Sequence, residues 1–279
     1  MMPQGGGGML NIAHRGARSL APENTMAAAR KALALGADMW EMDMAVTQDG
    51  ALIVFHDDSL LRTTDAKARF PRRSPWTFTD FSLEEIRSLD SGSWFVETDP
   101  HGEIAAGHVS AAEQKSLRGE KVPTLEEALL FTQESDWRIN VELKRLPPPL
   151  ENFPVVERVL DLIRRLKIDK RRVVFSSFNH AWVREVRARD ADFEAEALVG
   201  FNNVLPMLVE PLEFKAYNMR STLTNEAEVL SLTRRGIAVK LYVVNEEGDM
   251  RRFIAAGAAG LFTDFPQRLA PLKKSLALT

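Results

Sequence analysis

Short apolar runs alternate with amphipathic stretches along most of the chain, and this alternation predicts strands joined by helices. An alternating order of this kind is typical of a parallel sheet with crossover helices, and eight strands in about 250 residues favour a closed (β/α)8 barrel of the TIM type. The eight predicted strands are LNIAH from residue 10, DMWEMDMAV from 38, RINVELK from 138, RRVVFSS from 171, AEALVG from 195, EFKAYNM from 213, IAVKLYVVN from 237 and AGLFTD from 259.

The intervening stretches carry helix signals. Residues 24–37, NTMAAARKALALGA, predict the first helix, with Asn24 as its N-cap and Gly36 as its end. Apolar residues recur at helical spacing in residues 124–133 and 154–167, which predicts two further helices.

The segment between His56 and Thr124 is too long for an ordinary connection between a strand and a helix. We therefore expect an insertion after the second strand region, at about residues 58–122, with a short helix over 83–89. Two placements stay open, because such a segment can form a surface excursion or cover the mouth of the barrel and shape its pocket.

The rest of the chain predicts one catalytic domain over residues 9–270. We expect the glycine-rich start, residues 1–8, to be a flexible leader, and residues 271–279 to form a C-terminal tail.

Composition limits the classes of partner. The net charge of -3, from 36 basic and 39 acidic residues, provides no global field for nucleic acid or an anionic membrane, so any anion site must be local. The chain has no cysteine, which excludes disulfides, thiolate metal sites and cysteine nucleophiles. It has no apolar run of about 18 residues that could span a bilayer, and its first residues lack the features of a secretion signal. We expect a soluble, cytoplasmic protein with no membrane anchor; its oligomeric state stays open.

Two predicted strands carry acids at alternate positions. Glu41 and Asp43 are two residues apart, so both carboxylates point to one face of their strand, and Glu142 and Lys144 repeat the spacing on another strand. Outward-facing acids are one interpretation of this pattern. If they face the barrel interior, burial is costly without a cation, and three acids from two strands could hold Mg²⁺ or Ca²⁺ through oxygen ligands.

Two of the five histidines occupy strand exits. His14 ends the first predicted strand, and His56 follows the buried run at 52–55, so each becomes a candidate general acid or base beside the carboxylates. His101, His108 and His180 are expected to lie in solvent.

Six motifs in one order resemble the glycerophosphodiester phosphodiesterase family, and the resemblance extends from about residue 10 to about residue 268. It implies a TIM-type barrel that uses a divalent cation to hydrolyse small glycerophosphodiesters to glycerol 3-phosphate and an alcohol. The motifs are HRGARSLAPENT from residue 14, EMDMAVTQDGALIVFHDDSLLRTT from 41, VPTLEEAL from 122, NVELK from 140, FSSFN from 175 and GLFTDFP from 260.

The resemblance also implies roles for single residues. The catalytic histidines of the family fall on His14 and His56, and its phosphate-contacting cations on Arg15 and Lys144. Its metal ligands fall on Glu41, Asp43 and Glu142.

The chain departs from the family near the last strands. Where the family usually has the string WTVN, this chain has YVVN, which puts Tyr242 at the aromatic position. Tyr242 is therefore expected to line the substrate end of the pocket, or simply to pack the barrel interior.

Two other functions stay open. A related barrel phosphodiesterase acting on lysophospholipids or a sphingolipid head group would need an apolar trough beside the metal. A non-catalytic barrel that binds a metal or phosphate would need the acids and cations, but it would have no use for His14 and His56.

Overall fold

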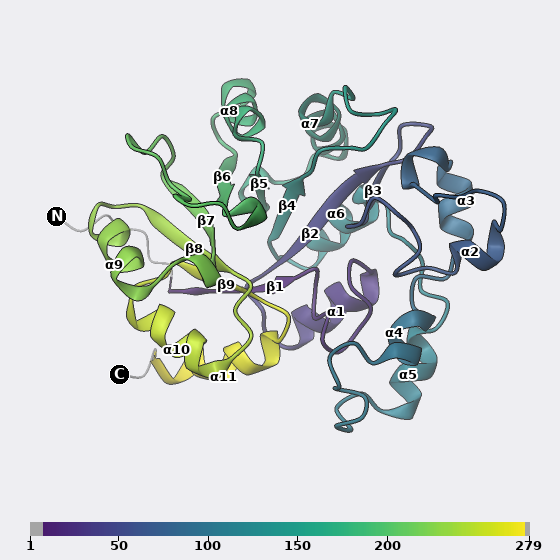
Figure 1. Ribbon diagram of the computed structural model, residues 1–279, viewed down its shortest axis with the longest axis horizontal. Coiled ribbons are helices and arrows are strands. Elements are labelled where there is room, and N and C mark those ends of the chain that lie inside the picture. The colour runs from purple at the N-terminus through teal and green to yellow at the C-terminus, as the bar shows by residue number, and fades with distance from the viewer. Residues whose placement is uncertain (1–7, 277–279) are drawn as a thin grey trace.

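Eight parallel strands close into a barrel with helices around it in the computed structural model, which describes residues 8–276 (Figure 1). The order β1-β9-β8-β7-β6-β5-β4-β2 is closed by pairing of β1 with β2, so the expected barrel is confirmed. These strands are β1 (Leu10–His14), β2 (Met39–Val46), β4 (Ile139–Leu143), β5 (Val173–Ser177), β6 (Glu194–Val199), β7 (Ala216–Arg220), β8 (Ala238–Tyr242) and β9 (Gly260–Thr263).

Each barrel strand coincides with a predicted one, and the structure adds a strand outside the barrel. The short β3 (Leu52–Val54) pairs antiparallel with β2, in the register Met44 with Val54. This hairpin returns the chain along β2, so His56 comes back to the barrel mouth two residues after β3 ends.

Helices surround the barrel and also occur in the insertion. Those predicted over 124–133 and 154–167 are confirmed as α6 and α7. The helices are α1 (Met26–Ala34), α2 (Ala66–Arg69), α3 (Leu83–Ser88), α4 (Ser93–Thr98), α5 (Ala111–Leu117), α6 (Leu125–Glu134), α7 (Val155–Leu166), α8 (His180–Arg189), α9 (Glu226–Arg234), α10 (Glu247–Ala255) and α11 (Pro266–Leu276), with 3-10 turns at Phe78–Asp80, Lys170–Arg172, Phe201–Asn203 and Ser221–Leu223.

The first helix begins one residue later than expected. Its N-cap is Thr25, whose hydroxyl accepts a hydrogen bond from the Ala28 amide at 3.2 Å. Asn24 is not the cap, because its backbone lies in the left-handed region (φ 56°) and its side chain bonds to Asp43. The prediction failed because Asn and Thr both suit an N-cap position. Only the fold shows that the Asn24 side chain instead donates a hydrogen bond to the Asp43 carboxylate.

Side-chain alternation on the strands separates two packed regions. Trp40 of β2 points outward, stacks on Trp137 with ring centroids 6.3 Å apart, and donates a hydrogen bond to the Thr132 hydroxyl of α6 at 3.0 Å. The preceding residue of the strand, Met39, packs in a separate cluster with Ile12 of β1. The strands therefore present one set of residues to the helices and the other to the barrel interior.

The barrel interior also contains buried charge. Lys240 of β8 donates to Glu196 of β6 at 2.5 Å, and both side chains are only 5% exposed. A buried ion pair of this kind is costly to break, because removing one partner leaves the other charge uncompensated.

The insertion lies at the side of the barrel. Helices α4 and α5 lie beside α1 (Figure 1), and Phe95, Val109 and Leu117 of the insertion form an apolar cluster with Leu20 and Ala28. The predicted helix over 83–89 is present as α3. The insertion is thus neither a bare surface excursion nor a cover over the mouth, since of its residues only Asp58 at its start lines the main cavity.

The predicted leader and the predicted tail lie at the two ends of the chain. The leader expected at residues 1–8 lies outside the described residues except for Gly8. The tail expected from residue 271 is wrong for residues 271–276, because they are the last turns of α11 and Leu272 is buried in the core. Across residues 8–276, no helix combines the length and the apolar character needed to cross a membrane.

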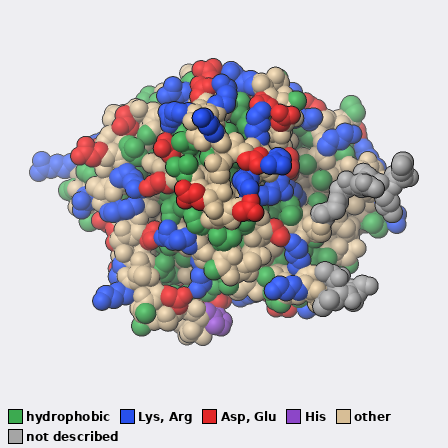
Figure 2. Space-filling view, turned by 180° about the vertical axis from the view of Figure 1, so that it is seen from behind, with side chains coloured by type: hydrophobic (Ala, Val, Ile, Leu, Met, Phe, Trp, Pro, Cys, Tyr) green, Lys and Arg blue, Asp and Glu red, His purple; other side chains and the backbone are tan. Residues whose placement is uncertain are grey.

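Charge is mixed over the surface rather than gathered by sign. On the face opposite to that of Figure 1, basic and acidic side chains are interspersed (Figure 2). This arrangement agrees with the small net charge of -3.

Gly16 allows the loop after β1 to pack against α1. Its φ is +82°, and an added Cβ would lie 2.6 Å from the Ala28 Cβ. Gly36 has a similar φ of +76° with open space around it. We expect both alanine variants to lose about 1–2 kcal/mol from backbone strain, and Gly16→Ala to lose about 1–3 kcal/mol more from overpacking. Urea unfolding of both variants measures the difference, and equal losses would contradict the packing account.

Candidate active site

Three acids meet at the carboxyl ends of neighbouring barrel strands. The register sets Glu41 of β2 beside His14 of β1, and Asp43 of β2 beside Glu142 of β4. Glu41, Asp43 and Glu142 each offer a carboxylate oxygen, and these oxygens lie within 4.8 Å of one another. The interpretation of Glu41 and Asp43 as outward-facing acids is therefore wrong, since both side chains are buried.

The three acids differ in pKa because they are buried close together and have different neighbours. Burial, with the Asp43 charge adding to it, raises the pKa of Glu41 well above its usual value and the pKa of Glu142 to about 7. Burial acts in the same direction on Asp43, but the charges of Lys144 and Arg15 outweigh it and hold the pKa of Asp43 well below its usual value.

The donor set fits a hard divalent cation. All three groups offer carboxylate oxygens, the ligand type that Mg²⁺ and Ca²⁺ prefer. No donor in the described part of the chain hydrogen-bonds to the Glu142 carboxylate. A cation among these oxygens would offset both the mutual repulsion and the loss of hydration.

Asp43 is fixed by two neighbours of different kinds. Asn24 donates from Nδ2 to Asp43 Oδ2 at 2.8 Å, and Lys144 donates from Nζ to Asp43 Oδ1 at 3.2 Å. Lys144 also donates to the His56 carbonyl at 3.0 Å. This lysine therefore connects the acid cluster to the segment that carries the second predicted histidine.

Arg15 contacts the cluster through both its backbone and its side chain. Its amide donates to Glu41 Oε2 at 2.9 Å, and its Nε lies 3.2 Å from Asp43 Oδ2. The amide reaches the carboxylate because Arg15 itself adopts a positive φ of 57° directly after β1. The guanidinium is thereby held at the mouth of the barrel.

Each predicted histidine is paired with an aspartate. The Nδ1 atom of His14 lies 2.7 Å from Asp264 Oδ1, and that of His56 lies 2.5 Å from Asp57 Oδ1. Despite burial, hydrogen bonds and charges from their neighbours hold the pKa of both aspartates below the usual range, so both are ionised and only accept. Nδ1 is therefore the donor in both rings, and Nε2 is left to act as the proton carrier.

His14 is neutral at pH 7. Burial, with the Arg15 charge adding to it, lowers the pKa of His14 to about 4, even though Asp264 acts in the opposite direction. A neutral imidazole with a free Nε2 can accept a proton.

Glu23 connects three arginines behind this site. It pairs with Arg15 Nη1 at 2.8 Å, Arg18 Nη2 at 2.7 Å and Arg62 Nη2 at 2.7 Å. Arg62 also donates to Asp57 Oδ2 at 2.5 Å. Glu23 thus links the predicted phosphate-contacting arginine to the aspartate that orients His56.

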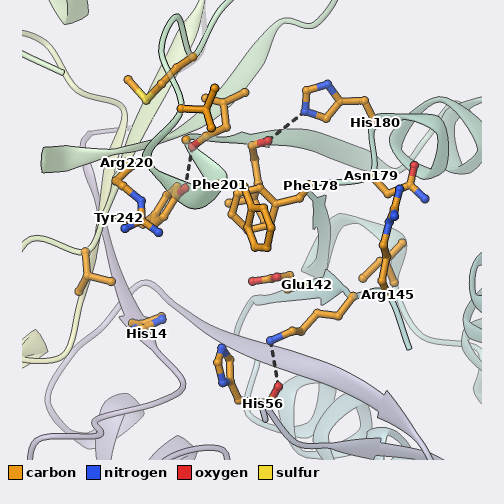
Figure 3. A pocket seen from close by; sticks show the side chains of 18 of the residues that line it. His14, His56, Glu142, Arg145, Phe178, Asn179, His180, Phe201, Arg220 and Tyr242 are labelled. Carbon is orange, nitrogen blue, oxygen red and sulfur yellow. Dashed lines mark hydrogen bonds between the residues drawn. The ribbon is translucent and has the colours of Figure 1, made fainter. Parts of the chain in front are cut away.

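A cavity of about 1090 Å³ opens over the predicted residues and includes His14, Arg15, His56, Glu142 and Lys144 in its lining. Figure 3 shows His14 and His56 at one end, the rings of Phe178, Phe201 and Tyr242 at the other, and Glu142 between them. Arg145 and Arg220 also line it, although sequence analysis assigned no role to either.

Tyr242 has contacts on two sides. It lines the cavity, and it also packs against the cluster in the barrel interior. Its hydroxyl donates to the Val199 carbonyl at 2.6 Å, and burial raises its pKa to about 12. The phenol is thus neutral and engaged with β6, which leaves the ring as the part that faces the cavity.

The remaining histidines are only partly as expected. His108 is exposed and bonds to Glu103 at 2.7 Å. His101 is half-buried against Phe265, and His180 lines the cavity with its Nε2 2.9 Å from the Leu198 carbonyl, so neither lies free in solvent.

Four site residues escaped sequence analysis: Glu23, Asn24, Asp57 and Asp264. Asp264 directly follows β9, and an acid at a strand exit is a signal that could have found it. Asp57 follows His56, and that adjacency was a usable signal as well. Glu23 and Asn24 look like ordinary helix-start residues, so the sequence offers no comparable signal for them.

Comparison with known proteins places the chain in a family. The model of the glycerophosphoryl diester phosphodiesterase family matches residues 14–268. The chain belongs to this family. The family and the enzyme class expected from the motifs are confirmed.

Members of the glycerophosphoryl diester phosphodiesterase family resemble this chain along nearly its whole length. A glycerophosphodiester phosphodiesterase of Caldanaerobacter subterraneus subsp. tengcongensis is 32% identical over 268 residues, covering 94% of this chain and 97% of the relative. One of Bacillus subtilis is 29% identical over 277 residues, covering 95% and 87%.

Solved structures show the same fold. A putative glycerophosphoryl diester phosphodiesterase from Silicibacter pomeroyi has a TM-score of 0.76 at 24% identity, covering 97% of this chain and 95% of its own. An Oleispira antarctica phosphodiesterase in complex with the product sn-glycerol-3-phosphate has a TM-score of 0.73 at 24% identity, covering 96% of both chains.

The charge network around Glu23 predicts a pH-dependent contribution to stability. Despite burial, the arginines lower the pKa of Glu23 to about 2, so its contribution is present above its ordinary pKa of 4.5 and is lost as the pH falls towards 2. We expect Glu23→Gln to cost about 2–4 kcal/mol at pH 7, because the buried position loses its charge and three arginines lose their ionised partner.

Urea unfolding of wild type and Glu23→Gln at pH 7, 4.5 and 3 tests this prediction. The difference in unfolding free energy should shrink below pH 4.5. Glu97→Gln, which removes an exposed partner of Arg118, serves as the control and should change little. A difference that stays constant down to pH 3 would contradict the assignment.

Proposed function

We propose that this chain hydrolyses glycerophosphodiesters to glycerol 3-phosphate and an alcohol, with a divalent cation and two histidine proton carriers. The observation that carries the proposal is one cavity lined by two histidines, two cations and Glu142, with two further acids beside Glu142 and an aspartate on each histidine. The names of the similar relatives and the product held by the Oleispira antarctica phosphodiesterase support the same reaction.

Negative charge is the first obstacle in this reaction, since a phosphodiester monoanion repels an incoming nucleophile. Arg15 and Lys144 both line the cavity and present fixed positive charge there. They would bind the phosphate oxygens and stabilise the charge that builds up in the transition state.

Glu41, Asp43 and Glu142 would hold the cation, Mg²⁺ or Ca²⁺. When bound, such an ion supplies Lewis-acid polarisation of a phosphate oxygen. Asn24 and Lys144 orient Asp43 by hydrogen bonds, so that this ligand is held even without the ion.

Two protons must move during hydrolysis. His14, neutral and oriented by Asp264, would take a proton from the nucleophile as it attacks phosphorus. His56, oriented by Asp57, would give a proton to the alcohol as its bond to phosphorus breaks. The nucleophile is either water or the glycerol 2-hydroxyl, which would first form a cyclic phosphate.

A non-catalytic binding barrel explains the site less well. Binding a metal or phosphate needs the acids and cations, but it does not need two imidazoles whose Nδ1 atoms are both fixed by aspartates. We also propose a cytoplasmic location, which the absence of cysteine supports.

Metal dependence can be tested by binding and by activity. Titration calorimetry should show one Mg²⁺ or Ca²⁺ site, and Glu142→Gln should weaken it by at least about tenfold, a loss that even outer partners of metal sites cause. Glu194→Gln, at an exposed position of β6, is the control. Equal affinity of wild type and Glu142→Gln would contradict the ligand assignment.

Release of glycerol 3-phosphate from glycerophosphocholine and glycerophosphoethanolamine tests the reaction itself. Release should stop in EDTA, return with Mg²⁺ or Ca²⁺, and be absent in Glu41→Ala. No release with either ion would overturn the proposed function.

The roles of the two histidines are tested by the kcat of their alanine variants. We expect His14→Ala and His56→Ala each to lower kcat by about 10²- to 10⁴-fold, the usual contribution of one general acid or base. His108→Ala, at an exposed histidine outside the cavity, should leave kcat unchanged. Full activity in the His14→Ala, His56→Ala double variant would refute proton transfer by these residues.

A further inference from the structure

The insertion contacts the segment that follows β9. Glu103 lies in the insertion between α4 and α5, and Arg268 lies in the first turn of α11. The two residues are 165 positions apart in the sequence, and Arg268 Nη2 lies 3.4 Å from Glu103 Oε1. Glu103 is only 6% exposed. The insertion therefore places a buried carboxylate at the start of α11, close in the chain to the aspartate that orients His14.

Arg268 is also held against two groups of the barrel. Its guanidinium carbon lies 3.6 Å from the centre of the Phe265 ring, which is a cation–π contact, and its Nη1 donates to the Asn245 carbonyl at 3.3 Å. His101, a second residue of the insertion, contacts the same ring edge-on, with the ring centroids 5.5 Å apart. The insertion thus reaches Phe265 directly through His101 and indirectly through the pair of Glu103 and Arg268.

Asn245 and Phe265 both adjoin Asp264. Phe265 is the next residue in the chain, and Asn245 makes two hydrogen bonds to Asp264. Asn245 Nδ2 donates to Asp264 Oδ2 at 2.8 Å, and the Asp264 amide donates to Asn245 Oδ1 at 2.9 Å. The other carboxylate oxygen, Oδ1, lies 2.7 Å from His14 Nδ1. Because Asn245 fixes one oxygen of this carboxylate, the other stays directed at the imidazole.

A continuous series of polar contacts therefore leads from the insertion to the first histidine. It runs from Glu103 to Arg268, Asn245, Asp264 and His14, with 3.4, 3.3, 2.8 and 2.7 Å between successive partners. The two contacts of Arg268 are longer than those of Asp264. Since hydrogen bonds weaken with distance, we expect the outer part of the series to have the smaller effect.

A purely structural role for Glu103 explains these contacts less well. A buried ion pair is costly to form, and an apolar pair of similar volume often gives equal or greater stability. The ion pair instead fixes the position of Arg268, over the Phe265 ring and beside the Asn245 carbonyl. An apolar pair would leave that carbonyl without this donor.

We propose that Glu103 is a positioning residue, which acts through Arg268 and Asn245 to hold Asp264 where it keeps the proton of neutral His14 on Nδ1. The kinetic consequence rests on the proposed function, because there the free Nε2 of His14 takes the proton from the nucleophile. None of the positioning groups contacts the substrate in this account. The insertion therefore affects the rate of the reaction and leaves the binding of the substrate unchanged.

Two substitutions at Glu103 test its contact with Arg268. Glu103→Leu removes the acceptor, whereas Glu103→Gln keeps an oxygen that Arg268 can contact. A misplaced catalytic group can cost about 100-fold in rate, and because the contacts of Arg268 are long we expect Glu103→Leu to lower kcat for glycerophosphocholine by about tenfold. The KM should stay within about twofold, and Glu103→Gln should keep kcat within about threefold of wild type.

A second variant and a control accompany these two. Arg268→Met, at a side chain that is 33% exposed, should lower kcat as much as Glu103→Leu, and the two changes combined should lower it no further, because both break one series of contacts. Glu97→Leu makes the same change at an exposed acid of the insertion and should leave kcat unchanged.

The position of the His14 proton gives a readout that a merely structural role would not change. Nitrogen NMR of protein labelled in its histidines distinguishes a proton on Nδ1 from one on Nε2, and the His14 signals are identified by their absence in His14→Ala. At pH 7 we expect Nδ1–H in wild type and in Glu97→Leu. The Nε2–H form should appear in Glu103→Leu, and to a larger extent in Asn245→Ala.

Two results would contradict the inference. One is a wild-type kcat in Glu103→Leu, or a loss that Glu103→Gln shares in full. The other is a wild-type proton position on His14 in Glu103→Leu, which would mean that any loss of activity arises elsewhere. If Glu103→Leu does not fold, Arg268→Met decides the question by the same two measurements.

Failure of the proposed function is recognised separately. If wild type releases no glycerol 3-phosphate with Mg²⁺ or Ca²⁺, the proposed function fails. The NMR measurement needs no substrate, so it still decides whether Glu103 positions His14.

Discussion

Mutual repulsion among Glu41, Asp43 and Glu142 determines what surrounds them. Three carboxylates whose oxygens lie within 4.8 Å cannot all be ionised in a buried setting without compensating charge. The side chains of Arg15 and Lys144 supply part of that charge next to Asp43, and Asn24 adds a hydrogen bond to the same carboxylate. The cluster therefore retains one strongly ionised acid and two acids with raised pKa values, which is the arrangement expected where a cation completes the site.

The ion pairs of Glu23 hold the residues around the acid cluster in place. Glu23 is buried among three arginines, of which Arg15 contacts the acid cluster and Arg62 contacts Asp57. Arg62 belongs to the insertion, so the segment at the side of the barrel still contributes to the orientation of His56. The insertion thus acts on the site through ion pairs, without covering its mouth.

Sequence alone predicted the features that depend on local periodicity. The strands follow from their apolar runs, and alternation within β2 correctly placed Glu41 and Asp43 on one face. It could not reveal that Asp264 would meet His14, because 250 residues separate them and only barrel closure through β1 and β9 brings them together. Asn24 was misjudged for the opposite reason, since its local signal fitted a helix cap while a distant carboxylate determined its conformation.

The aromatic side of the cavity lay beyond prediction in a further way. Its rings come from the segments after β5 and β6 and from β8, and no periodic pattern in the sequence connects Phe178, Phe201 and Tyr242. Phe201 and Val204 belong to the segment between β6 and β7, and only the fold shows that they face the same cavity as Glu142.

The central claim, that the three acids hold a divalent cation where phosphate binds, is tested most directly by a crystal structure with Mn²⁺ and glycerol 3-phosphate. Anomalous scattering locates the manganese without ambiguity. The account predicts one strong peak in contact with Glu41, Asp43 and Glu142, and a phosphate in contact with Arg15 or Lys144. A bound phosphate with no manganese at these carboxylates, or manganese bound only elsewhere, would contradict it.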